Sequence, residues 1–275
     1  MHIHGFNIGV CSWSLRPKNA ADLVAGVRAL GLSHIQLALG SLLAMDAARQ
    51  RAEVEILRSS GLQLTATMIG FAEEDYSTIA RIHETGGYLA DTTWPIRKQL
   101  TVSASKLSAE MGVKLLTTHI GFVPAKGGAR YAVMLERIGQ LTELLANDGV
   151  TLLLETGQEK ASALLEFLED LDVDNLGVNF DPANMILYGA GDPIEAIGVL
   201  AKHIRHVHVK DAIAADRPGE AWGEEVAFGT GQVGPREFLS ALKSAGYHGP
   251  LVIEREAGEN RAGDVTTAIQ ALQAI

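Results

Sequence analysis

Four side chains that can bind a metal ion stand where apolar segments end. Glu155 follows TLLL, Asp181 follows LGVNF, His208 lies within HIRHVHVKD and Glu254 follows PLVI. The steps between them are 26, 27 and 46 residues, and one strand with one helix and two short loops occupies roughly 30 residues in a parallel α/β unit. In a closed barrel of such units the C-terminal ends of all strands open onto one face. The sequence therefore predicts one site built from four strands.

Three carboxylates and one imidazole form a hard, mainly oxygen donor set. Such a set suits Mn²⁺, Mg²⁺ or Co²⁺ in roughly octahedral geometry, with Mn²⁺ favoured and Zn²⁺ less suited by ligand type. An open cation can hold a hydroxy-carbonyl substrate by two oxygens and stabilise the enediolate that forms when an α-proton leaves. Glu155 or Glu254 could serve as the base. If they lie on opposite sides of a bound ketose, one removes a proton and the other returns it, which yields epimerisation.

Further polar and aromatic residues are candidates for binding the substrate. They are His119, Asn184, Lys210, Trp13 and Arg217. Three of them have an alternative interpretation: Lys210 could pair with Asp211 or another carboxylate, His119 could be a satisfied core histidine, and Trp13, like Trp222, could pack instead of stacking on a sugar ring.

Eight short aliphatic and β-branched runs alternate with helical patterns along the chain. The runs are FNIGVCSW, SHIQLAL, LQLTATMI, VKLLTTHI, VTLLLE, NLGVNF, IRHVHVK and PLVIE. Asp192, Pro193 and Glu195 predict a helix start, and Gly31, Gly61 and Gly246 occupy expected helix C-termini. This count and alternation predict an α/β fold, a (β/α)₈ TIM barrel, as a single domain over residues 1–275.

Two connections are longer than usual, residues 71–95 and 212–234, and the second carries Arg217. Long connections in compact domains are commonly lids or binding loops, so both are expected to overhang the site. Gly229, Gly231 and Gly234 could suggest a phosphate loop. No lysine follows them in a P-loop arrangement, so turn glycines before a helix explain them better.

The composition and net charge of the chain argue against nucleic acid and membranes as binding partners. Apolar residues make up 47% of the chain and the net charge is −10, so the overall field repels nucleic acid and anionic membranes. Cys11 is the only cysteine and is expected to be a small core residue. The N-terminus lacks a secretory signal and no run approaches the ~18 apolar residues of a membrane span. We expect a cytoplasmic protein that binds a small-molecule sugar or cyclitol.

Longer motifs match a known group of proteins in order and spacing. They are IGVCSWSL, TTHIGF, LLLETG, NFDPANMILYG, HIRHVHVKDA and FGTGQVGPREFLSALKSAGYHGPLVIERE. With them the chain resembles the xylose isomerase-like sugar phosphate isomerase/epimerase superfamily, which includes ketose 3-epimerases, inosose dehydratases and endonuclease IV. The resemblance implies a (β/α)₈ barrel, a metal quartet of Glu155, Asp181, His208 and Glu254, and an acid/base pair of Glu155 and Glu254. A homodimer or homotetramer is the corresponding family-level expectation.

Two positions depart from the ketose 3-epimerase pattern. Asn184 stands where those enzymes carry a histidine, and Gln36 stands where they tend to carry a glutamate. Asn184 can bond a hydroxyl but cannot act as an acid. The leading hypothesis is therefore a metal-dependent isomerase or epimerase, whether or not its substrate is phosphorylated. An inosose-type dehydratase or keto-sugar lyase is the alternative; the net charge opposes an abasic-site endonuclease, and the intact quartet opposes a non-enzymatic sugar-binding protein.

Overall fold

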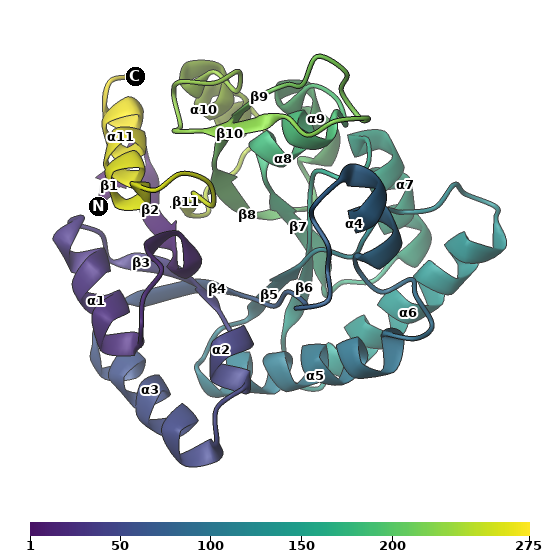
Figure 1. Ribbon diagram of the computed structural model, residues 1–275, viewed down its shortest axis with the longest axis horizontal. Helices are drawn as coiled ribbons and strands as arrows, with labels where there is room; N and C mark the ends of the chain where they lie inside the picture. Colours follow the sequence, from purple (N-terminus) through teal and green to yellow (C-terminus); the bar gives the residue numbers. More distant parts are fainter.

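Eight parallel strands close into a barrel in the computed structural model, which describes all 275 residues (Figure 1). They are β2 (Phe6–Cys11), β3 (His34–Ala38), β4 (Gln63–Met68), β5 (Leu115–Thr118), β6 (Thr151–Glu155), β7 (Leu176–Phe180), β8 (Ile204–Val209) and β11 (Leu251–Ile253). Neighbours pair in parallel in the order β2-β11-β8-β7-β6-β5-β4-β3, and pairing between β2 and β3 closes the ring. The predicted (β/α)₈ barrel is confirmed, with one strand in each of the eight runs.

Helices form the outer layer around this barrel (Figure 1). The longer ones are α1 (Ala20–Ala29), α3 (Ala47–Ser59), α5 (Trp94–Glu110), α6 (Ala129–Ala146), α7 (Ala161–Leu171), α9 (Pro193–Leu200), α10 (Pro235–Ser244) and α11 (Arg261–Gln273). Short elements are β1 (His2–Ile3), the 3₁₀ turn η1 (Ser12–Leu15), α2 (Gly40–Leu43), α4 (Ile79–Thr85), α8 (Pro182–Tyr188), β9 (Asp211–Ile213) and β10 (Glu224–Val226). None of the helices is both long and apolar enough to span a bilayer.

The local signals in the sequence correspond to real element ends. The Asp192 carboxylate accepts the backbone N–H groups of Ile194 and Glu195 at the start of α9, which satisfies donors that the first helical turn leaves free. Gly31 and Gly246 have φ values of 68° and 72°, as expected where a helix ends in the left-handed region.

Polar side chains fill part of the barrel interior beneath the C-terminal mouth. His206 is fully buried; its Nδ1 lies 2.8 Å from Asn179 Oδ1 and its Nε2 2.9 Å from Thr65 Oγ1. Burial lowers the pKa of His206 to about 3, so the ring is neutral. Because successive strand residues alternate in direction, His208 lies on the same side of β8 one layer closer to the mouth.

The connection 71–95 is held down by two buried arginines, and it contains the helix α4. Arg97 is 1% exposed and donates to the carbonyl oxygens of Thr85, at 2.9 Å, and of Gly87. Arg137 donates to Tyr88 O at 2.8 Å. Gly87 has a φ of 66°, and a Cβ there would lie 1.8 Å from the carbonyl oxygen of Ile120, so only glycine lets the connection pack this closely.

The connection 212–234 is ordered by the antiparallel pair β9 and β10. It meets the first connection at Trp222, whose Nε1 donates to the carbonyl oxygen of Tyr76 at 3.1 Å. The two long connections are thus in direct contact beside the barrel mouth, in agreement with the expectation that both overhang the site.

Candidate active site

The four predicted ligands converge at the C-terminal end of the barrel. Glu155 is the last residue of β6, Asp181 directly follows β7, His208 lies in β8 and Glu254 directly follows β11. All four are buried, with at most 5% of any residue exposed. His208 Nδ1 lies 3.4 Å from Glu155 Oε1, 3.3 Å from Asp181 Oδ2 and 3.2 Å from Glu254 Oε2. The four residues can each offer one donor atom within 4.8 Å of every other.

This donor set fits a hard divalent cation. Metal–ligand bonds of about 2.1 Å at right angles place neighbouring donors about 3.0 Å apart, close to the separations from His208 Nδ1. Glu254 Oε2 is buried, with Lys210 Nζ 2.8 Å away as an ion-pair partner. The three buried carboxylates of Glu155, Asp181 and Glu254 carry more negative charge than this one ammonium group balances, and a divalent cation would compensate the remainder.

Gln36 fixes which nitrogen of His208 faces the carboxylates. Gln36 Oε1 lies 2.6 Å from His208 Nε2, while Gln36 Nε2 donates to Thr117 Oγ1 at 2.7 Å. Because Gln36 Nε2 is the donor to Thr117, its Oε1 is an acceptor and His208 Nε2 must carry the hydrogen. Nδ1 then faces the carboxylate cluster, the orientation that a metal-ligating imidazole needs.

Replacing Gln36 by leucine should weaken metal binding. Loss of the acceptor frees the imidazole tautomer, and such outer partners of a ligating histidine typically contribute 10- to 100-fold in affinity. Titration of chelator-treated protein with Mn²⁺ by calorimetry measures this change. Gln63→Leu, at an exposed position of β4, is the matched control; equal affinities for the two variants would refute this role of Gln36.

Lys210 compensates the negative charge of the cluster. Its Nζ lies 2.8 Å from Glu254 Oε2, 3.6 Å from Asp181 Oδ2 and 3.0 Å from Glu256 Oε2. Burial alone would lower the pKa of Lys210, but Glu254, Glu256 and Asp181 raise it well above the ordinary value. The ammonium group therefore keeps its charge beside the site. The ion pair with Asp211 that the sequence allowed is not formed; Lys210 pairs with the other carboxylates instead.

The carboxylates keep their charge as well. Burial would raise the pKa of Glu155, but the nearby imidazoles of His119 and His208 outweigh it and lower the pKa. Burial acts in the same direction on Glu254, whose pKa Lys210 and His208 lower. Both glutamates are thus ionised and able to accept a proton.

Asn184 and His119 flank Glu155 on the pocket side. Asn184 Nδ2 donates to Glu155 Oε1 at 3.1 Å, and its Oδ1 accepts from Lys210 at 3.3 Å. His119 Nε2 lies 3.6 Å from Glu155 Oε1, whereas its buried Nδ1 has no partner. Gly157 makes this arrangement possible, since a Cβ there would lie 2.5 Å from Asn184 Cβ.

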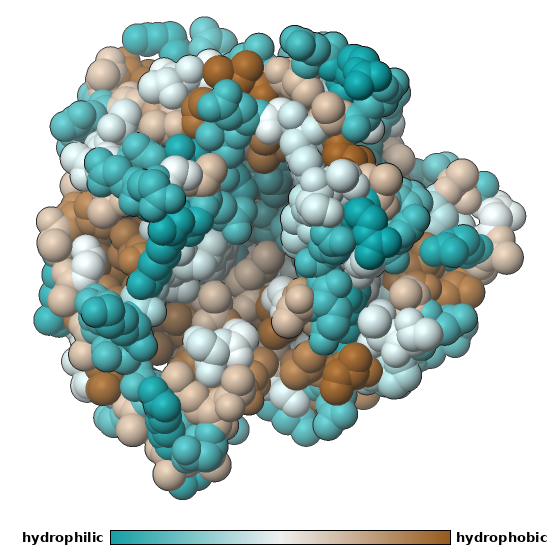
Figure 2. All heavy atoms as spheres, in the orientation of Figure 1, coloured by the Kyte–Doolittle hydropathy of each residue, from teal (hydrophilic) through white to brown (hydrophobic).

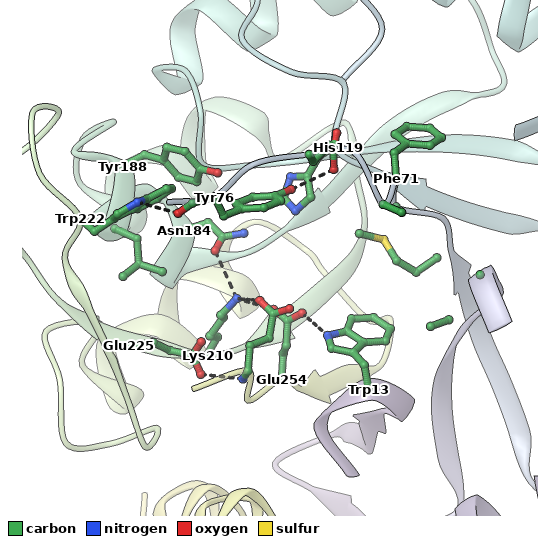
Figure 3. Close-up of a pocket in the computed structure, with 18 of the residues that line it drawn as sticks. Trp13, Phe71, Tyr76, His119, Asn184, Tyr188, Lys210, Trp222, Glu225 and Glu254 are labelled. Carbon is green, nitrogen blue, oxygen red and sulfur yellow. Dashed lines mark hydrogen bonds and ion pairs between the residues drawn. The ribbon is translucent and has the colours of Figure 1, made fainter. Parts of the chain in front are cut away.

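A cavity of about 730 Å³ opens above these groups, visible as the hollow at the centre of the face in Figure 2. Figure 3 shows Lys210, Glu254 and Trp13 on one side of it and an aromatic group on the other. That group is Tyr76, Tyr188 and Trp222, with the rings of Tyr188 and Trp222 4.7 Å apart. Trp13 Nε1 donates to Glu254 Oε1 at 2.7 Å, so its indole orients a carboxylate as well as lining the pocket.

Arg217 does not belong to this site, contrary to the expectation from the sequence. Its side chain is 75% exposed, pairs with Glu220 at 3.1 Å and does not line the cavity. The connection 212–234 does reach the cavity, through Trp222 and Glu225. Sequence position alone could not decide which residue of a long connection turns inward.

The glycine-rich segment FGTGQVG donates its backbone N–H groups to a carboxylate of the protein itself rather than to a phosphate. The buried Asp211 carboxylate accepts the backbone N–H groups of Gly229, Gly231 and Val233 at 2.9–3.0 Å, together with that of Ala212. A Cβ at Gly231 would lie 2.3 Å from Asp211 Oδ1. The donors that a phosphate would need are thus already occupied by Asp211.

Replacing Asp211 by asparagine should therefore destabilise the connection 212–234. The amide nitrogen cannot accept the two N–H groups that now reach one carboxylate oxygen, and hydrogen bonds to a charged group contribute about 1.5–3 kcal/mol each. We expect a loss of about 3 kcal/mol in the free energy of unfolding, measured by urea denaturation. Asp216→Asn, exposed on the same connection, should change it little; a similar loss in both variants would contradict the anchoring role.

Several residues of the cavity had no signal in the sequence. They are Ala38, Met68, Gly70, Phe71, Glu74, Tyr76, Tyr188, Glu225 and Glu256. Glu256 lies two residues after Glu254 and shares its strand-end location, so that spacing could have identified it. Ala38 and Met68 are the last residues of β3 and β4, and Tyr188 is the last residue of α8. The remaining residues lie in connections whose paths only the packing determines.

A family model for the xylose isomerase-like TIM barrel matches residues 24–275. The chain belongs to this family. A solved structure of a xylose isomerase domain protein from Planctomyces limnophilus is 34% identical and superposes with a TM-score of 0.88 over 98% of this chain and 96% of that one. The structure of L-ribulose 3-epimerase shares the fold, with 18% identity and a TM-score of 0.71 over 100% of this chain and 95% of that one.

Curated relatives match over shorter regions. Inosose dehydratase from Geobacillus thermodenitrificans is 24% identical over 162 residues, which are 52% of this chain and 53% of that protein. The chain spans between 37% and 53% of the length of the curated relatives that it matches. The proteins similar to this barrel thus include an epimerase in fold and a dehydratase in sequence.

Proposed function

We propose that the protein is a divalent-metal-dependent isomerase or epimerase that moves a proton next to the carbonyl group of a sugar or cyclitol. The observation that carries the proposal is a pair of buried, ionised glutamates, Glu155 and Glu254, grouped with one imidazole and one aspartate beneath the cavity, which Glu254 lines. Epimerisation requires two bases at one carbon, and general bases act at hydrogen-bond reach of the proton they remove.

Glu155, Asp181, His208 and Glu254 would hold the cation, with Mn²⁺ the favoured ion and Mg²⁺ or Co²⁺ alternatives. A bound cation supplies Lewis acidity that withdraws charge from a carbonyl and an adjacent hydroxyl. Glu155 and Glu254 accept and return the proton. Lys210 and Asn184 lie beside them to bind developing negative charge and a hydroxyl, while Trp13 and Trp222 bound the cavity.

A dehydratase is a second candidate, favoured by one feature of the site. Lys210 keeps its proton, because neighbouring carboxylates raise its pKa well above the ordinary value, and it borders the cavity. An ammonium group at this place could donate a proton to a departing β-hydroxyl. The similarity to inosose dehydratase supports the same alternative. Both reactions begin with loss of an α-proton, so they differ only in the fate of the resulting enediolate.

Proton NMR in D₂O distinguishes the two reactions. Chelator-treated protein is incubated with ketoses, inososes and keto-glycosides, with and without Mn²⁺, Mg²⁺ or Co²⁺. For an isomerase or epimerase we expect metal-dependent entry of deuterium next to the carbonyl without loss of water. An unsaturated product would instead indicate the dehydratase. Exchange that is unaffected by chelation, or absent with every substrate and metal, would reject a metal-dependent enzyme of this class.

A further inference from the structure

A second cavity of about 320 Å³ adjoins the active-site cavity. It lies between the turn that leads from β2 into α1 and the elements α2 and α3, which are neighbours at the same side of the barrel in Figure 1. Trp13, Ala38 and Ser41 line both cavities. We call the second one the side cavity. Of these shared residues, Trp13 also contacts the catalytic group, because its indole donates to Glu254.

The floor of the side cavity is apolar. It consists of Leu23, Leu37, Leu42, Met45 and Leu57. Leu23, Leu37, Leu42 and Leu57 are at most 5% exposed, so the floor belongs to the packed layer between barrel and helices. A surface of this kind gains free energy by covering an alkyl or aryl group, about 25 cal/mol for each Å² of apolar area removed from water. Sugar hydroxyls gain nothing comparable there.

The rim of the side cavity is cationic. Arg16 and Lys18 line it and are exposed. The nearest carboxylate to Arg16 is Glu259 at 3.9 Å, with a 99% exposed side chain, and such a pair contributes little. Lys18 has no ion-pair partner. The one carboxylate of the lining, Glu53, already accepts the N–H group of Ala20 at 2.6 Å.

The backbone at Arg16 strengthens the case for a specific role. Arg16 has a φ of 48°, in the left-handed region that a long side chain rarely occupies. This conformation ends η1 and is fixed by a bond from Arg16 N to Trp13 O. The same turn therefore positions both Trp13, which the two cavities share, and the cation of the rim.

We propose that the side cavity binds an apolar substituent of the substrate that ends in a carboxylate. The substrate would be a conjugate, with its sugar or cyclitol above Glu155 and Glu254 and an aryl or alkyl acid as the aglycone over the leucine floor. Arg16 and Lys18 pair with the acid group. This inference rests on the proposed function for the position of the sugar. The two adjoining volumes together suit a ligand larger than a monosaccharide, since cavities of roughly 300–1,000 Å³ accommodate drug-sized molecules.

The side cavity can be tested without knowing the sugar. The probe is 3-phenylpropionate, with 3-phenylpropanol as its neutral counterpart, and the readout is calorimetry combined with saturation-transfer NMR on the Mn²⁺-loaded protein. We expect the acid to bind at least 10-fold more tightly than the alcohol. The double change Arg16→Gln and Lys18→Gln should remove that preference, while Arg236→Gln, an exposed arginine on α10, should leave it intact.

A second variant addresses the apolar floor. Leu42→Trp fills the side cavity and should abolish binding of both probes. If this variant folds poorly, the double change Arg16→Gln and Lys18→Gln still tests the proposal. Equal binding of acid and alcohol, or an acid that binds unchanged to the double variant, would overturn the proposal. Inorganic phosphate that competes with 3-phenylpropionate yet binds the Leu42→Trp variant normally would also overturn it, because the rim would then serve as a simple anion site.

A turnover experiment separates the side cavity from the proposed function. On whichever sugar passes the NMR screen, a carboxyaryl glycoside should show at least 10-fold higher kcat/KM than the unsubstituted sugar, and the double variant should lose this advantage. Turnover of the free sugar without a higher kcat/KM for the glycoside would refute the role of the side cavity but not the proposed enzymatic activity. Probe binding that depends on Arg16 and Lys18, without turnover of any sugar, would refute the proposed enzymatic activity but not the binding role of the side cavity.

Discussion

Replacing Glu155 or Glu254 by glutamine is expected to lower turnover by about 10²- to 10⁴-fold, the usual contribution of a general acid–base group. Each amide keeps the shape of the side chain but can no longer accept a proton. Both carboxylates are buried and ionised. The measurement is kcat/KM at saturating Mn²⁺, with circular dichroism to verify that the fold is kept.

The two variants should also differ from one another in isotope exchange. If Glu155 and Glu254 serve opposite faces of the substrate, each single variant retains one base. It should exchange the proton of one epimer with D₂O, form no product, and leave the other epimer unlabelled. The epimer that exchanges should be the opposite one in the other variant. Glu220→Gln, exposed on the connection 212–234, is the matched control.

Loss of exchange with both epimers in both variants is the result expected if the glutamates only bind the cation. Metal content by elemental analysis then distinguishes the two roles. A variant that retains the cation but exchanges neither epimer would contradict the two-base assignment and leave a one-base isomerase.

Replacing Lys210 by methionine should separate stability from catalysis. The ammonium group is 2.8 Å from Glu254 and 3.6 Å from Asp181, and removal of one partner from a buried charge cluster typically costs about 3–5 kcal/mol. We expect a loss of this order in the free energy of unfolding of chelator-treated protein. Added Mn²⁺ should restore much of it, because the cation replaces the missing positive charge.

Turnover should not be restored with stability. If Lys210 binds developing negative charge or donates a proton, its loss lowers kcat by about 10²-fold or more, as for other preorganised donors. Affinity for Mn²⁺ should be at least as high as in the unaltered protein, since a repelling charge beside the cation is gone. Lys243→Met on the exposed side of α10 is the control. A Mn²⁺-loaded Lys210→Met protein with normal kcat would limit this lysine to a structural role.

The barrel and the four converging side chains could be predicted from the sequence because both depend on local patterns. A strand of a parallel barrel is a short aliphatic run, and a polar residue at its C-terminal end faces the common mouth whatever the rest of the chain does. Glu155, Asp181 and Glu254 are of this kind. His208 is placed by the two-residue period of β8.

Other features depended on which distant segments pack side by side. Gln36 reaches His208 across 172 residues of sequence, and nothing near either residue indicates the pairing. The anchoring of the glycine-rich turn by Asp211 and the exposure of Arg217 were decided in the same way, by the path of a long connection over the barrel. Local periodicity carries no information on such a path.

The sequence by itself thus determined the fold class, the mouth of the barrel and the chemical type of the site. Only the tertiary structure decided the hydrogen-bonding state of His208, the partners of Lys210 and the cavity behind Trp13. The physical reason is that strand ends are set by hydrogen-bonding and side-chain periods within a few residues, whereas cavities and buried charge pairs arise from close packing between elements far apart in the chain.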